Sequence, residues 1–300
     1  MTVATFLDLV STTPGPQGQA GGAARSFVVP EGWRQGRGAW GGLLAGPLLH
    51  AAARLGGEGQ RIRHASIQML AAAAPGPALV TTEVIRAGGA TTAVDLRLLG
   101  AEADADGAPQ PGHGTLAHAT VVLGRARAAE AGADGETWRT LEPPEALAAG
   151  SDATAVVPLG PPLAPEFLSQ LEVRPVAGFP LTGEPDGHTL AWVRPRRPVG
   201  AGLDAASADV VLGALADAMW PATLVRLATM HPLATVGYAL DLPGQVAPEA
   251  LVDDEGLLVP LLHRGRLVAA REGYVTETRE LWHPCGVLLS VNTQTVAVIR

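Results

Sequence analysis

The sequence predicts an α+β protein made of two tandem copies of one unit, in which a curved antiparallel sheet wraps a long buried helix. Three observations support this fold class. An extended segment, a helix and then four strands occur in the same order twice within the 300 residues. Both helical segments are apolar on every side, and both sets of strands follow in hairpin succession. One helix against a run of antiparallel strands, repeated in one chain, indicates a tandem duplication.

The first half begins, after a loose segment, with a short extended piece at residues 26–29 and a glycine-rich turn. The first helix is predicted at residues 41–55. Segments rich in β-branched or alternating residues follow, and we expect strands at residues 63–70, 78–87, 91–100 and 114–123. The run Arg-Ala-Gly-Gly-Ala at residues 86–90 predicts the hairpin turn between the second and third strands.

The second half repeats this order. An extended piece at residues 188–194 precedes a helix predicted at residues 208–229. We expect strands at residues 234–242, 256–263, 266–276 and 287–298. Arg264 and Gly265 predict the hairpin turn that matches the one in the first half.

Both predicted helices are unusually apolar. His50 is the one polar side chain at residues 41–53, and Asp217 is the one at residues 210–222. A helix that is apolar all round is buried, so a sheet must wrap it. This is the arrangement of the hotdog fold, and the chain is expected to be a double hotdog. Pro47 and Pro221 predict a kink or break in each helix.

The segment between the halves, rich in Ala, Gly, Pro and acidic residues, has the composition of a linker. We expect an N-terminal hotdog at residues 1–125, a linker at 126–165 and a C-terminal hotdog at 166–300 that carries the site. The two halves should pair edge to edge as an internal pseudo-dimer. Whether the chain forms a further homo-oligomer is left open.

The composition excludes several reaction classes. All 21 basic residues are Arg. Phosphate-loop NTPases, Schiff-base and PLP enzymes, and Ser-x-x-Lys enzymes each need a Lys. The net charge of −8 argues against a nucleic-acid partner. Cys285 is the single cysteine, and the eight His residues show no ligand spacing, so no metal site is expected.

The apolar runs are much shorter than a membrane span, and Asp8 stands where a signal peptide would carry basic residues. We therefore expect a cytoplasmic protein with no membrane span.

Asp217 is the most informative single residue. A carboxylate among apolar neighbours is costly to bury unless it is hydrogen-bonded, and such residues are enriched at active sites. Satisfaction by a neighbouring backbone group is the alternative. Thr235, at the start of a predicted strand, and Gln294, in the last strand, are ordinary by themselves. In a helix wrapped by a sheet, however, the three side chains can converge.

Two further motifs have competing interpretations. Gly36 to Gly41 formally match the dinucleotide motif G-x-G-x-x-G. No apolar strand runs into the first glycine, so a tight turn leading into the helix is favoured over a nucleotide site. Arg194, Arg196 and Arg197 are candidates for binding phosphates, although solvated surface arginines are the ordinary case.

Together these segments resemble the acyl-CoA thioesterase II family, the TesB-like double-hotdog enzymes that hydrolyse fatty acyl-CoA. The resemblance covers essentially the whole chain and is carried by Gly38-Ala39-Trp40-Gly41-Gly42, Leu215-Ala216-Asp217-Ala218, Pro221-Ala222, Leu233-Ala234-Thr235-Val236, Leu281-Trp282, Gln294 and the linker residues Pro143-Pro144-Glu145. It implies that Asp217, Thr235 and Gln294 hold the attacking water. Thr293 or Thr295 replaces Gln294 if the last strand is shifted by one residue. The first half is apolar where Asp217 would map, so one site per chain is expected.

The resemblance implies a mechanism without cofactor or metal. Asp217 would act as general base on a water positioned by Thr235 and Gln294, with N–H groups at a helix N-terminus, such as those of Gly41 and Gly42, polarising the thioester carbonyl. The partner would be acyl-CoA, its phosphates meeting Arg residues at a pocket mouth. A non-catalytic acyl-CoA or lipid-binding double hotdog, or an enoyl-thioester hydratase, are the alternatives. Acyl chain length is not predicted.

Overall fold

The computed structural model describes residues 4–14, 24–103, 109–127, 140–200 and 202–299. Within them, one antiparallel sheet contains twelve strands in the order β1-β2-β6-β7-β8-β5-β11-β14-β13-β12-β10-β9, and β3 and β4 form a separate small hairpin. The strands of the first half are β1 (Thr13–Pro14), β2 (Ala24–Val29), β3 (Arg34–Gln35), β4 (Gly38–Ala39), β5 (Gln60–Met69), β6 (Gly76–Ala87), β7 (Thr91–Ala103) and β8 (Pro109–Arg125). Those of the second half are β9 (Leu171–Ala177), β10 (His188–Pro195), β11 (Leu233–Asp241), β12 (Leu261–Arg271), β13 (Tyr274–Trp282) and β14 (Leu288–Val298).

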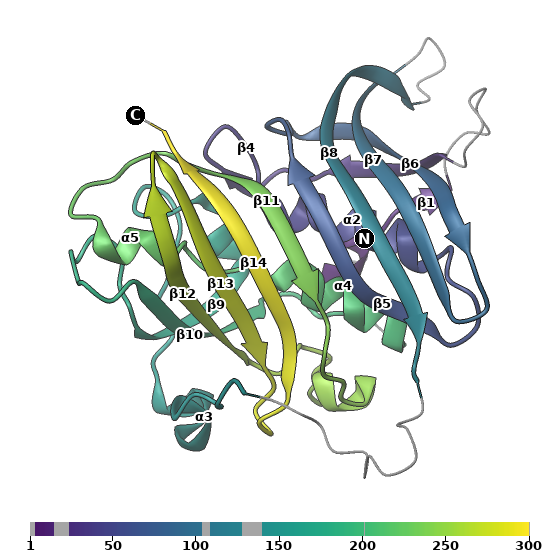
Figure 1. Ribbon diagram of the computed structural model, residues 1–300. Helices are drawn as coiled ribbons and strands as arrows, with labels where there is room; N and C mark the ends of the chain where they lie inside the picture. Colours follow the sequence, from purple (N-terminus) through teal and green to yellow (C-terminus); the bar gives the residue numbers. More distant parts are fainter. Residues whose placement is uncertain (1–3, 15–23, 104–108, 128–139, 201, 300) are drawn as a thin grey trace.

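The two halves are arranged symmetrically about the middle of the sheet. In each half the long helix is followed by the strand that lies at the centre, β5 in the first half and β11 in the second. These two strands pair antiparallel, with Gln68 opposite Gly237 and His64 opposite Asp241. The two predicted curved sheets are therefore joined edge to edge into one, as Figure 1 shows, and the expected internal pseudo-dimer is present.

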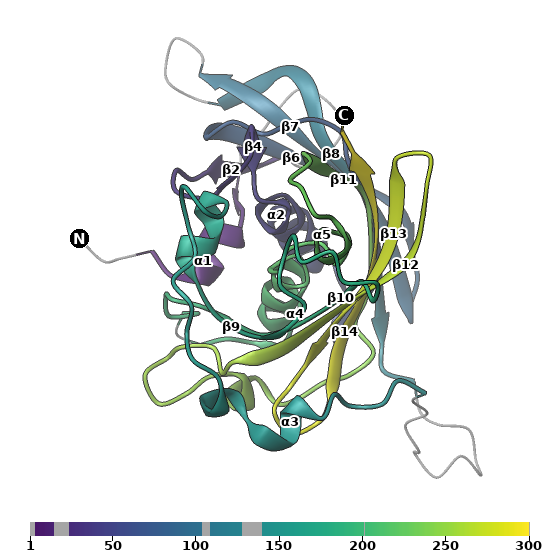
Figure 2. The same ribbon diagram turned by 90° about the vertical axis from the view of Figure 1, so that its left-hand side faces the viewer.

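The concave side of the sheet encloses α2 (Gly41–Ala53) and α4 (Ala205–Leu215), as Figure 2 shows. The predicted burial of both helices is confirmed, since most of their side chains are inaccessible to solvent. Small residues let the helices pack closely against each other: a Cβ on Gly213 would lie 2.3 Å from Leu49 Cδ1, and one on Gly42 would lie 2.5 Å from the Ala214 carbonyl oxygen. The shorter helices are α1 (Phe6–Val10), α3 (Ala146–Ala149) and α5 (Thr223–Arg226), and the 3₁₀ helices are η1 (Ser151–Ala153), η2 (Glu166–Gln170) and η3 (Pro248–Leu251).

The second long helix is shorter than expected. It ends at Leu215, where the N–H groups of Asp217 and Ala218 bond to carbonyls three residues back, at 3.2 and 2.9 Å. Pro221 prevents the helix from resuming at once, because a proline disfavours helical geometry in the residue before it; α5 begins only at Thr223. The predicted helix is therefore interrupted over residues 216–222, which include Pro221, but α4 already ends at Leu215, ahead of the proline. By contrast, Pro47 does not break α2, which runs through it.

The hairpin predicted at Arg264 and Gly265 is wrong. Strand β12 runs through both residues, and the turn lies at Glu272 and Gly273, which have positive φ values of 56° and 80°. Gly265 serves close packing instead, because a Cβ there would lie 2.4 Å from Thr189 Oγ1 on the neighbouring strand β10. The corresponding hairpin of the first half, between β6 and β7, is confirmed.

The edge strand β9 was not predicted from the sequence. It covers the outer edge of β10 and matches the short β1 beside β2 in the first half. Residues 128–139 of the predicted linker and most of the loose segment near the N-terminus lie outside the described residues. Among the helices that the structure describes, none has the length and apolar character needed to cross a membrane.

An ion pair joins the halves beneath the sheet. The Asp209 carboxylate on α4 is 2% exposed and accepts hydrogen bonds from Arg61 on β5, with an Nε–Oδ2 distance of 3.0 Å. We expect Arg61→Met to lower the free energy of unfolding by about 3–5 kcal/mol, because it leaves a buried carboxylate unpaired. Urea unfolding measures this. Arg63→Met, on the same strand, should lower the free energy of unfolding much less. The double variant Arg61→Met with Asp209→Leu should recover most of the stability lost in Arg61→Met. An equal loss in both single variants would contradict the assignment.

Candidate active site

Asp217 lies in the turn that directly follows α4, so the end of that helix places it. The residue is 6% exposed. Its backbone carbonyl accepts a hydrogen bond from Trp40 Nε1 at 2.8 Å. Trp40 precedes α2 and stacks between Trp33 and Phe167, with ring centroids 5.7 and 5.2 Å away. The start of the first-half helix is thus fixed to the end of the second-half helix.

One oxygen of the Asp217 carboxylate is held by two donors from the sheet. Oδ1 accepts a hydrogen bond from Arg279 Nη1 at 2.7 Å and another from Gln294 Nε2 at 2.8 Å. The second nitrogen-bound hydrogen of Gln294 is directed to Asn292 Oδ1 at 2.9 Å, and Thr235 Oγ1 donates to Gln294 Oε1 at 3.1 Å. The three residues expected to form the site therefore belong to one hydrogen-bonded network.

The structure resolves the register of the last strand. Gln294 is fully buried on the inner face of β14, and neither Thr293 nor Thr295 is buried. On the neighbouring strand, the pairing of β11 with β14 shifts between Thr235 and Gly237. This irregularity accommodates the extra residue Val236, as a β-bulge does, and both Thr235 and Val236 line a cavity.

This cavity, which we call the shared cavity, has a volume of about 790 Å³ and is lined by both halves of the chain. Gly41 and Asp217 lie next to each other in its lining: a Cβ built on Gly41 would lie 2.5 Å from Asp217 Oδ2. Oδ2 has no hydrogen-bond partner among the described residues, in contrast to Oδ1. Much of the remaining lining is apolar and includes Leu44, Met69, Leu70, Phe167, Leu168 and Leu224.

The electrostatic surroundings favour a reactive carboxylate. Burial raises the pKa of the Asp217 carboxyl above its ordinary value, although the Arg279 guanidinium and the Gln294 amide act in the opposite direction. A raised pKa makes a carboxylate a better proton acceptor. Asp217 therefore has the geometry and the environment of a general base whose free oxygen faces a cavity.

Of the two glycines predicted to polarise a carbonyl, Gly41 lines the shared cavity. Gly42 packs against the Trp40 ring and the Ala214 carbonyl oxygen. The first N–H groups of a helix have no partner within the helix and carry positive partial charge. Since Gly41 is the first residue of α2 and lies against Asp217 Oδ2, the start of this helix adjoins the free oxygen of Asp217.

The predicted phosphate-binding arginines lie elsewhere. Arg194 bonds to Glu172 at 3.1 Å and to Asp253 at 3.2 Å, so two acids already engage its guanidinium. Arg197 donates to the Ala4 carbonyl, Arg196 is exposed, and none of the three lines the shared cavity. The arginine that does line it is Arg37, an exposed residue in the turn between β3 and β4 that pairs with no acid among the described residues.

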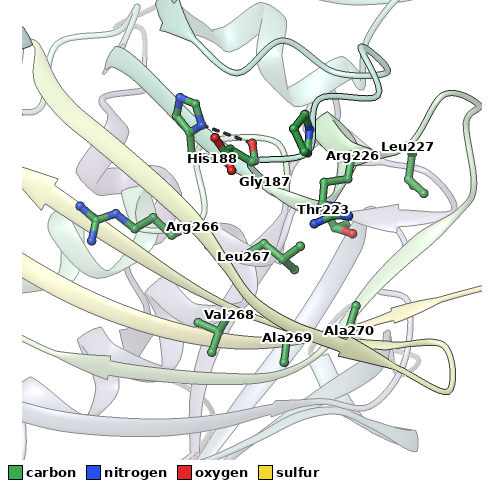
Figure 3. A pocket seen from close by; sticks show the side chains of 12 residues that line it. Gly187, His188, Thr223, Arg226, Leu227, Arg266, Leu267, Val268, Ala269 and Ala270 are labelled. Carbon is green, nitrogen blue, oxygen red and sulfur yellow. Dashed lines mark hydrogen bonds between the residues drawn. The ribbon is translucent and has the colours of Figure 1, made fainter.

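A second cavity of about 670 Å³, the side cleft, lies beside α5 and the end of β12. Figure 3 shows two arginines among its lining residues, Arg226 and Arg266, on opposite sides of the view with Leu267 between them. They do not converge on one point as a phosphate site requires. The side cleft contains none of the predicted site residues.

Arg279 and its neighbour Glu277 were missed by the sequence analysis. Both are almost fully buried, at 2% and 0% exposure. The alternation of side chains along a strand could have indicated that both are buried, because residues two apart face the same side of the sheet. Glu277 and Arg279 lie in step with Val275 and Leu281, which are buried, while Thr276 and Thr278 between them are half-buried.

Known proteins are similar to the chain along most of its length. The family model of the acyl-CoA thioesterase N-terminal domain matches residues 29–124, and that of the acyl-CoA thioesterase C-terminal domain matches residues 143–298. No match was found among curated proteins.

Solved structures share the fold. A hot dog fold protein of unknown function from Alicyclobacillus acidocaldarius is 23% identical with a TM-score of 0.73, covering 99% of both chains. The acyl-CoA thioesterase II TesB2 of Mycobacterium marinum is 15% identical with a TM-score of 0.61, covering 92% of this chain and 91% of its own. The tesB protein of Mycobacterium avium subspecies paratuberculosis is 13% identical with a TM-score of 0.65, covering 92% and 93%. With both halves matched by its domain models, the chain belongs to the acyl-CoA thioesterase family.

Proposed function

We propose that the chain hydrolyses fatty acyl-CoA to the free acid and CoA, with Asp217 as the general base. The observation that carries this proposal is the asymmetry of one buried carboxylate. Its Oδ1 is fixed by Arg279 and Gln294, while its Oδ2 faces the shared cavity beside the start of α2. A base held in this way meets the geometric requirement for activating a water molecule.

The reaction needs no other nucleophile. Asp217 Oδ2 accepts a proton from water as the water oxygen attacks the thioester carbonyl carbon. The negative charge that develops on the carbonyl oxygen is stabilised by N–H groups at the start of α2. The carbon–sulfur bond then breaks, and the proton held by Asp217 passes to the departing sulfur, which yields the carboxylic acid and the CoA thiol.

The remaining predicted residues support this step. Thr235 lines the cavity, and we assign it to contact the water. Both amide hydrogens of Gln294 are directed to Asp217 and Asn292, so we assign Gln294 to orient the base. The apolar part of the lining suits an acyl chain. Arg37 offers the CoA phosphates a cation within the same cavity.

The test is the release of free CoA thiol from a panel of acyl-CoAs that runs from acetyl-CoA to palmitoyl-CoA. We expect thiol release that depends on chain length and saturates with substrate. A non-hydrolysable S-alkyl-CoA should inhibit it competitively. Binding of this analogue with no thiol release at any chain length would support a binding protein instead. Loss of enoyl-CoA absorbance without thiol release would support a hydratase.

A further inference from the structure

Two buried charged residues continue the network behind Asp217. Arg279 contacts Asp217 Oδ1 through Nη1 at 2.7 Å, and its Nε and Nη2 contact Glu277 Oε1 at 2.7 and 2.6 Å. The other Glu277 oxygen accepts a hydrogen bond from the Ala222 backbone N–H at 2.9 Å. Ala222 follows Trp220 and Pro221, which line the shared cavity. Glu277 thus connects the cavity wall to the partner of the base.

A buried Arg–Glu pair is weak evidence for a role in stability, because the cost of removing two charges from water can exceed their attraction. A role beyond stability is therefore expected. The ionised Asp217, Arg279 and Glu277 side chains carry a net charge of −1, since two are acids and one is a base. When Asp217 accepts a proton the sum becomes zero, so the second acid reduces the opposition of Arg279 to that proton transfer.

We propose that Arg279 and Glu277 are positioning residues for the hydrolysis proposed above, on which this inference rests. Arg279 fixes Oδ1 of Asp217 so that Oδ2 faces the water. Glu277 orients Arg279 and offsets its charge, which keeps Asp217 able to accept a proton.

The other titratable groups near Asp217 neither fix its Oδ1 nor offset the charge of Arg279. Burial lowers the pKa of His263 on β12 to about 3, so it is neutral at working pH. Burial raises the pKa of Tyr238 on β11 well above its usual value, and its hydroxyl donates to the Gly213 carbonyl. Arg37 and His231 also line the shared cavity, but neither is among the hydrogen-bond partners that the structure gives for the Asp217 carboxylate. Arg279 lowers the pKa of Asp217 and Glu277 raises it, alongside the larger effect of burial.

The test compares kcat and KM across pH for two variants on an acyl-CoA that the wild type hydrolyses. Activity requires ionised Asp217 and falls as pH drops through its pKa. In Glu277→Gln, loss of the acid lowers that pKa, so the acid limb of the profile moves to lower pH and the plateau kcat falls about tenfold because the base is weaker. In Arg279→Met the limb moves to higher pH, and kcat falls about 10²-fold as the carboxylate loses its position. KM should change little in both.

Glu280→Gln is the matched control. Glu280 is on the same strand, 2% exposed and paired with Arg264, but it faces the other side of the sheet. It should keep the wild-type pH profile even if unfolding occurs at lower temperature. Arg279→Lys retains the charge and should return the acid limb towards the wild-type position. Limbs that move in the same direction, or a Glu280→Gln profile like that of Glu277→Gln, would overturn the inference. Full activity of Asp217→Asn would instead refute the base proposed above.

Discussion

Asp217→Asn should lower kcat for acyl-CoA hydrolysis by about 10²- to 10⁴-fold, the range of a lost general base. Asn has nearly the same shape as Asp, so its side-chain oxygen still accepts hydrogen bonds from Arg279 and Gln294 in place of Oδ1. The group facing the water becomes an amide nitrogen, which cannot take a proton. KM should change much less than kcat. Thiol release at saturating substrate measures the effect.

The pH dependence gives this prediction a second readout. Wild-type activity should fall as pH drops through the pKa of Asp217, because the ionised carboxylate is the active form. Since burial raises that pKa, the fall begins at a higher pH than it would for an exposed aspartate. The residual activity of Asp217→Asn should lack this limb.

Asp209→Asn is the control for the loss of a buried carboxylate near α4. Asp209 is 2% exposed and paired with Arg61, far along α4 from the shared cavity. This variant should lose stability and retain kcat. Wild-type turnover by a correctly folded Asp217→Asn protein would refute the role of Asp217 as base.

The sequence was sufficient to locate Asp217, because a carboxylate isolated in an apolar segment is costly to bury and such residues are enriched at active sites. It was not sufficient for Arg279, which lies 62 residues away in sequence and bonds to Asp217 only once β13 is placed beneath the end of α4. The same strand alternation that buries Val275 and Leu281 buries Glu277 and Arg279. The alternation of side chains alone does not show whether charged residues such as Glu277 and Arg279 form a buried ion pair or a solvated face of the strand. That distinction requires knowing which residues pack against them.

The fold followed from the sequence where local patterns and packing agree. Both apolar helices are wrapped by the sheet as expected, and the turn after β6 lies at its glycines. The hairpin at Gly265 was wrong because that glycine avoids a clash with Thr189 on the neighbouring strand, a contact that no local pattern reveals. The edge-to-edge pairing of β5 with β11 was anticipated, but its register, with Gln68 opposite Gly237, comes from the structure alone.

Gly41 lies directly against the Asp217 carboxylate, and enlarging this residue gives the second large prediction. Gly41→Ala should lower kcat about 10²-fold, the loss expected when a reacting group is displaced by about 1 Å. The added Cβ would lie 2.5 Å from Asp217 Oδ2 and 3.4 Å from its Cγ. The carboxylate cannot swing aside without breaking the hydrogen bonds at Oδ1, and the methyl group takes the room that a water needs. The same thiol-release assay measures the loss.

Gly41→Ala should also lower the free energy of unfolding modestly, because the helix propensity of alanine, about 1 kcal/mol in a helix interior and less at this first residue of α2, offsets only part of the strain. Gly89→Ala, in the hairpin after β6 where nothing lies within 4 Å of the new methyl group, is the control and should retain activity.

A double-mutant cycle shows whether the loss of activity in Gly41→Ala arises through Asp217. If the methyl group acts through Asp217, Gly41→Ala combined with Asp217→Asn should be no slower than Asp217→Asn alone, since the disturbed group is already inactive. Additive losses would mean that Gly41 acts independently of Asp217, for instance by providing a helix-terminal N–H group for the carbonyl oxygen.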